Sequence, residues 1–113
     1  MLRVSGDVVA ALSSAGRRKL AAEIAEATAR DHPEAVESEG GPEAFAAAAI
    51  EQAQALGLTT RGRIRAWARL RATHGADVAS LPWVSAVLED SALTPDERLS
   101  LIEDRALMRE ARG

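Results

Sequence analysis

The chain has 113 residues and a mass of 11.9 kDa, which is enough for one small domain and too little for two. It contains no cysteine, so disulfide bonds, thiolate zinc sites and cysteine nucleophiles are excluded. A net charge of −3, from 14 Lys plus Arg and 17 Asp plus Glu, argues against a generally basic nucleic-acid-binding protein. Any function that depends on positive charge must therefore involve a cluster of basic residues in one part of the chain.

The apolar residues favour helices. Alanine accounts for 25 of the 113 residues, whereas the aromatic residues are Phe45, Trp67 and Trp83. Alanine has the highest helix propensity, and strands favour β-branched and aromatic residues. We therefore predict an all-α fold, with residues 1–113 forming a single small domain of four to five helices in an orthogonal or irregular bundle. No apolar run approaches a membrane span of about 18 to 20 residues, and no signal-peptide core opens the chain, so we expect a cytoplasmic protein.

The first predicted helix runs from about Asp7 to Arg30. Apolar residues at the spacing of one helix face predict its buried side: Leu20, Ile24 and Ala27. His32 precedes a proline, which disfavours helical geometry at that residue and ends the helix. Residues 33–42 are acidic and include two consecutive glycines, which predicts a turn within the domain that holds one short helical turn.

The second predicted helix begins at Pro42, a residue suited to the first turn, and ends at Gly57, which favours a left-handed cap. Its predicted buried face comprises Phe45, Ala49, Ala53 and Leu56. The third helix is capped by Thr59 or Thr60, and it runs to about His74 before Gly75.

Two shorter patterns predict the remaining helices. Pro82 opens a short helix that ends near Asp90 and directs four residues inward: Trp83, Val84, Val87 and Leu88. Thr94 is followed by a proline and, three residues later, by Glu97, which is the pattern of a capping box. The last helix therefore runs from about Pro95 to Arg109, with Leu99, Ile102 and Ala106 on its buried face.

Charge is segregated along the chain. Residues 52–76 contain five arginines and no acidic residue, whereas residues 31–43 contain five acidic residues and no lysine or arginine. At about 100° per residue, one stripe of the third helix carries Arg61, Arg65 and Arg69. The opposite side carries Ile64, Trp67 and Leu70.

Three interpretations of this arginine-rich helix remain open. The pattern favours a solvated face paired with the domain's own acidic turn, then contact with an acidic protein partner, and least of all contact with nucleic-acid phosphates. Arg63 and Arg71 fall within the apolar arc, where they either extend along the edge of the core or border a surface through which Trp67 meets a partner. The candidate partner-binding residues are Arg61, Arg65, Arg69, Arg63, Arg71 and Trp67.

No pattern in the sequence predicts catalysis. The two histidines, His32 and His74, lack metalloprotease spacing, and there is no nucleophile elbow or glycine-rich phosphate loop. Adjacent acidic pairs diverge by about 100° on a helix and do not converge on one substrate atom. We assign no catalytic residue, no metal ligand and no cofactor, and we expect a non-enzymatic protein.

Helix caps and core residues follow one another in a distinctive order along the chain: Ala53-x-x-Leu56-Gly57-Leu58-Thr59, Trp67-x-x-Leu70, Gly75-x-Asp77, Leu81-Pro82-Trp83-x-x-x-Val87-Leu88-x-Asp90, Leu93 and Arg98. This order resembles a group of small helical proteins encoded in bacterial type VI secretion effector loci. The resemblance covers about residues 45–106 and, more loosely, the opening helix. The chain departs from the group at Val78, where phenylalanine is usual, and in the number of arginines on the third helix. The resemblance implies an accessory or adaptor role in loading toxins onto the secretion spike, and it transfers no catalytic residue.

The expected function is thus a non-enzymatic, chaperone-like adaptor that binds an acidic surface of a protein partner, such as a secreted toxin or spike protein. The alternatives are an immunity protein that blocks a cognate toxin and a small DNA-binding regulator. Self-association is a further expectation, with Arg61 to Arg71 of one copy meeting Asp31 to Glu43 of another. We expect no contact with membranes.

Overall fold

The computed structural model describes residues 13–112, which fold into six α-helices and one 3₁₀ turn without a strand. This confirms the predicted all-α class. The elements are α2 (Ser14–Asp31), α3 (Pro33–Ser38), α4 (Pro42–Ala55), α5 (Arg61–His74), η1 (Val78–Ser80), α6 (Pro82–Leu88) and α7 (Pro95–Arg112). The helix count exceeds the predicted four to five because the acidic segment after Pro33 forms a full short helix. The predicted start of the first helix, at about Asp7, lies outside the described residues.

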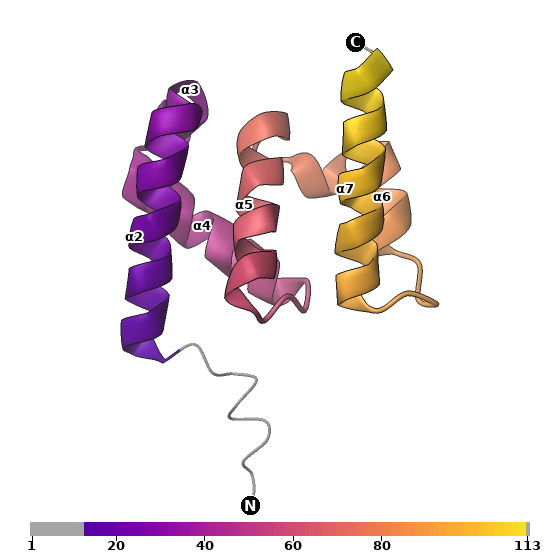
Figure 1. Cartoon of the computed structure of the whole chain (residues 1–113), viewed down its shortest axis with the longest axis horizontal. Coiled ribbons are helices and arrows are strands. Elements are labelled where there is room, and N and C mark those ends of the chain that lie inside the picture. Colours follow the sequence, from indigo (N-terminus) through magenta and orange to yellow (C-terminus); the bar gives the residue numbers. More distant parts are fainter. Residues whose placement is uncertain (1–12, 113) are drawn as a thin grey trace, which may run out of the picture.

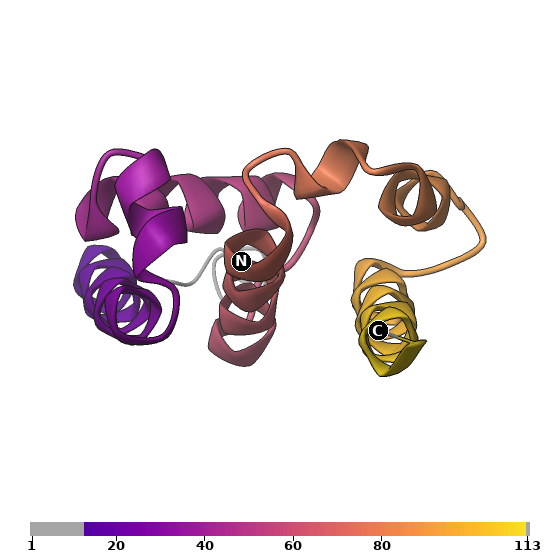
Figure 2. The same ribbon diagram turned by 90° about the horizontal axis from the view of Figure 1, so that it is seen from above.

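The elements lie in two layers (Figures 1 and 2). Helices α2, α5 and α7 run in the same direction, side by side in one layer, while α3, α4, η1 and α6 form the layer behind them. The rear elements return the chain to the start of the next front helix, α3 and α4 between α2 and α5, and η1 and α6 between α5 and α7. Helix α4 crosses behind both α2 and α5. The fold therefore consists of a front layer of three helices covered on one side by the shorter rear elements.

The core is centred on α4, because α4 packs against both α2 and α5. Three alanines of α4, Ala46, Ala49 and Ala53, are fully buried and leave room for the neighbouring helices to approach closely. The largest fully buried side chains come from every layer of the fold: Trp67, Phe45, Leu20, Ile50, Ile64, Ile102, Val78 and Val84. The predicted inward faces of α4 and α7 lie in one continuous core, as do Leu20 and Ile24 of α2. The prediction was wrong for Ala27, which is only partly buried, because the neighbouring Thr28 takes the buried position on that turn of α2.

Gly57 closes α4 in the predicted left-handed conformation, with φ at +88°. The N–H of Leu58 donates to the carbonyl of Ala53 at 3.0 Å, and the N–H of Gly57 donates to the carbonyl of Gln54 at 3.0 Å, which is a Schellman motif. A Cβ atom at residue 57 would lie only 2.8 Å from Cγ of Pro95. The end of α4 therefore packs tightly against the start of α7.

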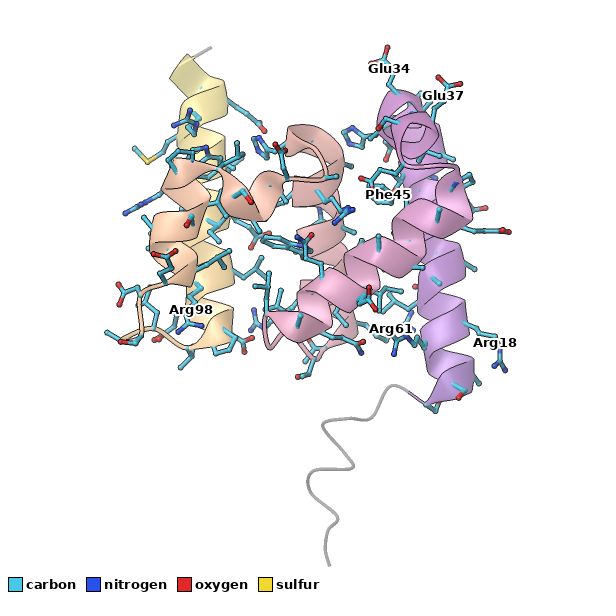
Figure 3. All side chains as sticks on the ribbon, turned by 180° about the vertical axis from the view of Figure 1, so that it is seen from behind. Arg18, Glu34, Glu37, Phe45, Arg61 and Arg98 are labelled. Carbon is cyan, nitrogen blue, oxygen red and sulfur yellow. The ribbon has the colours of Figure 1, made fainter. Side chains whose placement is uncertain are left out.

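The predicted capping box opens α7. The Thr94 hydroxyl accepts a hydrogen bond from the N–H of Glu97 at 3.1 Å, and the Glu97 carboxylate accepts one from the N–H of Thr94 at 2.9 Å. Arg98, labelled in Figure 3, donates two hydrogen bonds to the carbonyl oxygen of Asp90 and so fixes the loop before α7. None of the described helices has the length and apolar character needed to cross a membrane.

Candidate protein-interaction surface

All six sequence-predicted contact residues lie on α5, the central helix of the front layer. Arg61 lies at its start, beside α2 (Figure 3). Nη2 of Arg61 is 2.6 Å from Oε1 of Glu23 on α2, and Nη1 of Arg65 is 3.9 Å from the same oxygen. Arg61 therefore holds a close intramolecular partner, whereas the Arg65 guanidinium is only loosely paired.

Arg71 is built into a polar network behind the exposed face of α5. Its guanidinium donates to both carboxylate oxygens of Glu39, with Nη2 at 2.6 Å from Oε1, and its Nη1 donates to Oε1 of Gln52 at 2.8 Å. The same Gln52 oxygen accepts the indole N–H of Trp67 at 2.8 Å. The Arg71 and Glu39 side chains are only 11% and 10% exposed, so this network joins α5 to α4 and to the acidic turn within the domain.

Trp67 and Arg71 therefore have almost no surface to offer a partner. Trp67 is 1% exposed and fully part of the core, and its one polar atom is satisfied by Gln52. Among the five arginines of α5, Arg71 is the one that pairs with an acidic residue of segment 31–43 in the part of the chain that the structure describes. Exposed acids of that turn, Glu34 and Glu37, point away from α5 (Figure 3).

Arg63 connects α5 to α7. Its Nε lies 2.9 Å from Oδ1 of Asp96 in the first turn of α7, and both side chains are partly exposed. Both residues line the groove between α5 and α7, at the end where the two helices begin. The negative charge of Asp96 also stabilises α7, because it lies in the first turn, at the positive end of the helix dipole.

Arg69 differs from the other four arginines because no acidic side chain among residues 13–112 lies within ion-pair distance of it. It is exposed and lines cavities on both sides of α5. On one side is a groove of about 230 Å³ between α5 and α2, which Arg65 also lines. On the other side is the groove between α5 and α7. Arg69 therefore stands at the centre of the front face.

The groove between α2 and α5 also holds an ion pair at the carboxyl end of α2. Arg30 and Asp31 are adjacent residues that line this groove, and Nε of Arg30 lies 3.1 Å from Oδ1 of Asp31. The hydrogen bond from Arg30 lowers the pKa of the Asp31 carboxyl, and the same bond raises the pKa of Arg30. The Arg30–Asp31 pair therefore stays ionised through the neutral range.

A separate aromatic cluster joins the ends of α5, α6 and α7. The His74 ring meets the edge of Trp83 with 5.4 Å between centroids, and the Arg109 guanidinium lies 4.9 Å from the Trp83 ring centroid. Trp83 is partly buried against the core, as its predicted place in or beside the core requires. Nε2 of His74 is buried and has no hydrogen-bond partner among residues 13–112.

The sequence did not predict Glu23, Gln52 or Asp96 as partners of the arginines. Gln52 lies 19 residues before Arg71, and Glu23 lies 38 residues before Arg61. Local sequence patterns do not predict such pairs, because the pairs depend on which helices pack against each other in the folded domain.

No protein-family model matches the chain, and neither a curated protein nor a solved structure shows significant similarity to it.

Proposed function

We propose that the protein is a non-enzymatic adaptor that binds an acidic surface of another protein through the front face of α5. The observation that carries this proposal is the position of Arg69. Its side chain is exposed, has no acidic partner in the described region, and lines a groove on each side of α5. Arg65 extends the same basic ridge by one helical turn and is held only at 3.9 Å from Glu23.

An acidic protein surface suits this ridge chemically. A guanidinium forms paired hydrogen bonds with a carboxylate, and arginine is enriched in the central, energetically important part of protein interfaces. The shallow grooves beside Arg69 provide space for the apolar contacts that such an interface also needs.

The proposed contact surface is narrower than the six residues predicted from the sequence. It consists of Arg65 and Arg69, with Arg61 at its edge beside Glu23. The remaining three residues are left out of the proposed surface. Trp67 is buried, Arg71 is nearly buried and bound to Glu39, and Arg63 pairs with Asp96 on the α7 side of α5, away from Arg65.

Duplex DNA fits the same face less well. Carboxylates flank the arginine ridge on both sides, with Glu23 on α2 and both Asp96 and Glu103 on α7. These groups would repel phosphates that approached α5 along its length. A DNA-binding regulator is therefore the weaker candidate.

The resemblance to proteins of type VI secretion effector loci supports a more specific proposal, in which the partner is a secreted toxin or a spike protein and the adaptor assists loading. An immunity protein would use the same ridge against its cognate toxin. The two roles differ in outcome, because an adaptor is required for export, whereas an immunity protein protects cells that express the toxin.

The direct experiment is affinity capture from the host with the tagged full chain, compared with an Arg65→Glu/Arg69→Glu variant. The matched control is Arg18→Glu/Arg105→Glu, which changes the net charge equally at exposed positions elsewhere; Arg18 points away from the helices in Figure 3. We expect the first variant to lose a toxin or spike protein that the wild-type chain and the control retain, most clearly at low salt. Equal capture by all three proteins would contradict the proposal.

A further inference from the structure

We propose that two copies of this chain associate face to face through the groove between α5 and α7. The groove follows almost the whole of α5, a helix about 21 Å long at 1.5 Å per residue. Its lower part has a volume of about 470 Å³ and its upper part about 260 Å³. Ala66, Arg69 and Glu103 line both parts, so the two cavities form one continuous depression.

The two walls of this groove carry opposite charges. The α5 wall presents Arg69, and the α7 wall presents Glu103 and Glu110, none of which has an ion-pair partner in the part of the chain that the structure describes. The charges at the lower end are different, because Arg63 and Asp96 already pair with each other. The unpaired charges therefore lie along the middle and upper stretch.

Apolar surface is exposed along the same stretch. Leu107 is 64% exposed, and it lines the upper groove together with Leu70 and Ala106. Leu107 lies one turn beyond Glu103 on the same side of α7. Leucine at this level of exposure beside an apolar groove favours association with another surface.

A second copy supplies the complementary surface if the two-fold axis runs along the groove. Such an axis places α7 of the second copy over α5 of the first, and α5 of the second copy over α7 of the first. Arg69 then faces Glu103 of the second copy, and the same pair forms again on the other side of the axis, as an isologous interface requires. Leu107 lies over the apolar part of α5 of the second copy, near Leu70 of that copy.

Charge also excludes the other face-to-face arrangement. A two-fold axis across the groove would stack α5 on α5, so that Arg69 would lie against Arg69 of the second copy, and acidic α7 would lie against itself. Like charges in contact disfavour that arrangement. The groove is thus self-complementary in one orientation only.

This inference does not rest on the proposed adaptor function, because it concerns the chain alone. The two surfaces share Arg69, however, whereas Arg65 lines only the groove on the α2 side of α5. An acidic partner would therefore compete with the second copy for Arg69.

The test is sedimentation of the full chain over a range of concentrations at low salt, with three variants. The wild-type mass should rise from one chain toward two. Arg69→Glu and Glu103→Arg should each weaken the dimer about tenfold or more, because both symmetry-related ion pairs become like-charge contacts. Arg65→Glu, the matched control one turn away on α5, should leave the dimer unchanged.

Mixing the Arg69→Glu and Glu103→Arg proteins gives the sharpest result. Both contacts in the mixed pair join opposite charges, so the mixture should form dimers that neither variant forms alone. Circular dichroism of each variant establishes that the helices are intact. A wild-type chain that stays monomeric throughout, or a mixture that dimerises no better than its components, would overturn the inference.

Discussion

At the residue scale, Arg69 and Arg71 lie two positions apart on α5 and meet opposite environments. Arg69 is exposed between two grooves, whereas Arg71 is nearly buried and bound to Glu39 and Gln52. A helix turns by about 200° over two residues, so one side chain faces solvent and the other faces the acidic turn. The same residue type is therefore free of an acidic partner in the described region at one position and bound within the domain at the other.

Replacing Arg71 by methionine should destabilise the fold by about 3 to 5 kcal/mol, because it leaves the Glu39 carboxylate buried without its counter-charge. The Arg69→Met control should change stability by less than about 0.5 kcal/mol, as expected for an exposed side chain. Adding Glu39→Leu to Arg71→Met should recover part of the loss, since no unpaired charge then remains. Urea unfolding measures all four proteins, and equal losses for the two single arginine variants would contradict the assigned roles.

The two tryptophans should also differ in their contribution to stability. Trp67→Ala removes a fully buried ring and the indole hydrogen bond to Gln52, and it should cost about 3 to 5 kcal/mol. Trp83→Ala should cost clearly less, because the ring is only partly buried and packs on Arg109 and His74. Thermal unfolding of the two variants tests this order, and a loss below about 1 kcal/mol for Trp67→Ala would place its ring outside the core.

At the element scale, helix ends fix how the two layers connect. Gly57 allows α4 to end in a Schellman motif, and the lack of a side chain there lets Pro95 at the start of α7 pack against it. Gly75 similarly ends α5 with a positive φ before the chain enters η1. These two positions direct the chain into the neighbouring elements that enclose Trp67.

Gly57→Ala should destabilise the protein by about 1 to 3 kcal/mol, because a left-handed residue acquires a Cβ atom that contacts Pro95. Gly62→Ala is the matched control. Gly62 lies within α5, and a Cβ atom there meets nothing within 4 Å, so alanine should stabilise the helix by about 0.5 to 1 kcal/mol. Opposite signs for the two substitutions in chemical denaturation are the expected result, and the same sign for both would contradict the account.

At the scale of the whole molecule, the sequence predicts where helices begin and end much better than it predicts the ion pairs between side chains of different helices. The ends at Gly57, Gly75 and Thr94 follow from local conformational preferences, and each was predicted at the residue where the structure has it. The partner of Arg71 could not be predicted in this way, because Glu39 is 32 residues distant and meets it only after α3, α4 and α5 have packed.

The layered arrangement also sets the distribution of charge on the front face, on which the proposed function depends. Three parallel helices place an arginine ridge at the centre, carboxylates on both sides and a groove along each edge of α5. This distribution favours a partner with an acidic ridge and is unfavourable for a uniformly negative polymer. Recognition by the protein is therefore expected to weaken with salt while its helical core is unaffected.

Capture of host proteins by three forms of the full chain, at the same low salt concentration, shows whether the exposed arginines of α5 bind a partner. The forms are wild type, Arg65→Glu/Arg69→Glu and Arg18→Glu/Arg105→Glu. We predict that one partner is retained by the wild-type and control proteins and lost by the variant of the α5 ridge, with all three proteins equally helical. Retention of that partner by the ridge variant would contradict the claim that this face of α5 is the recognition surface.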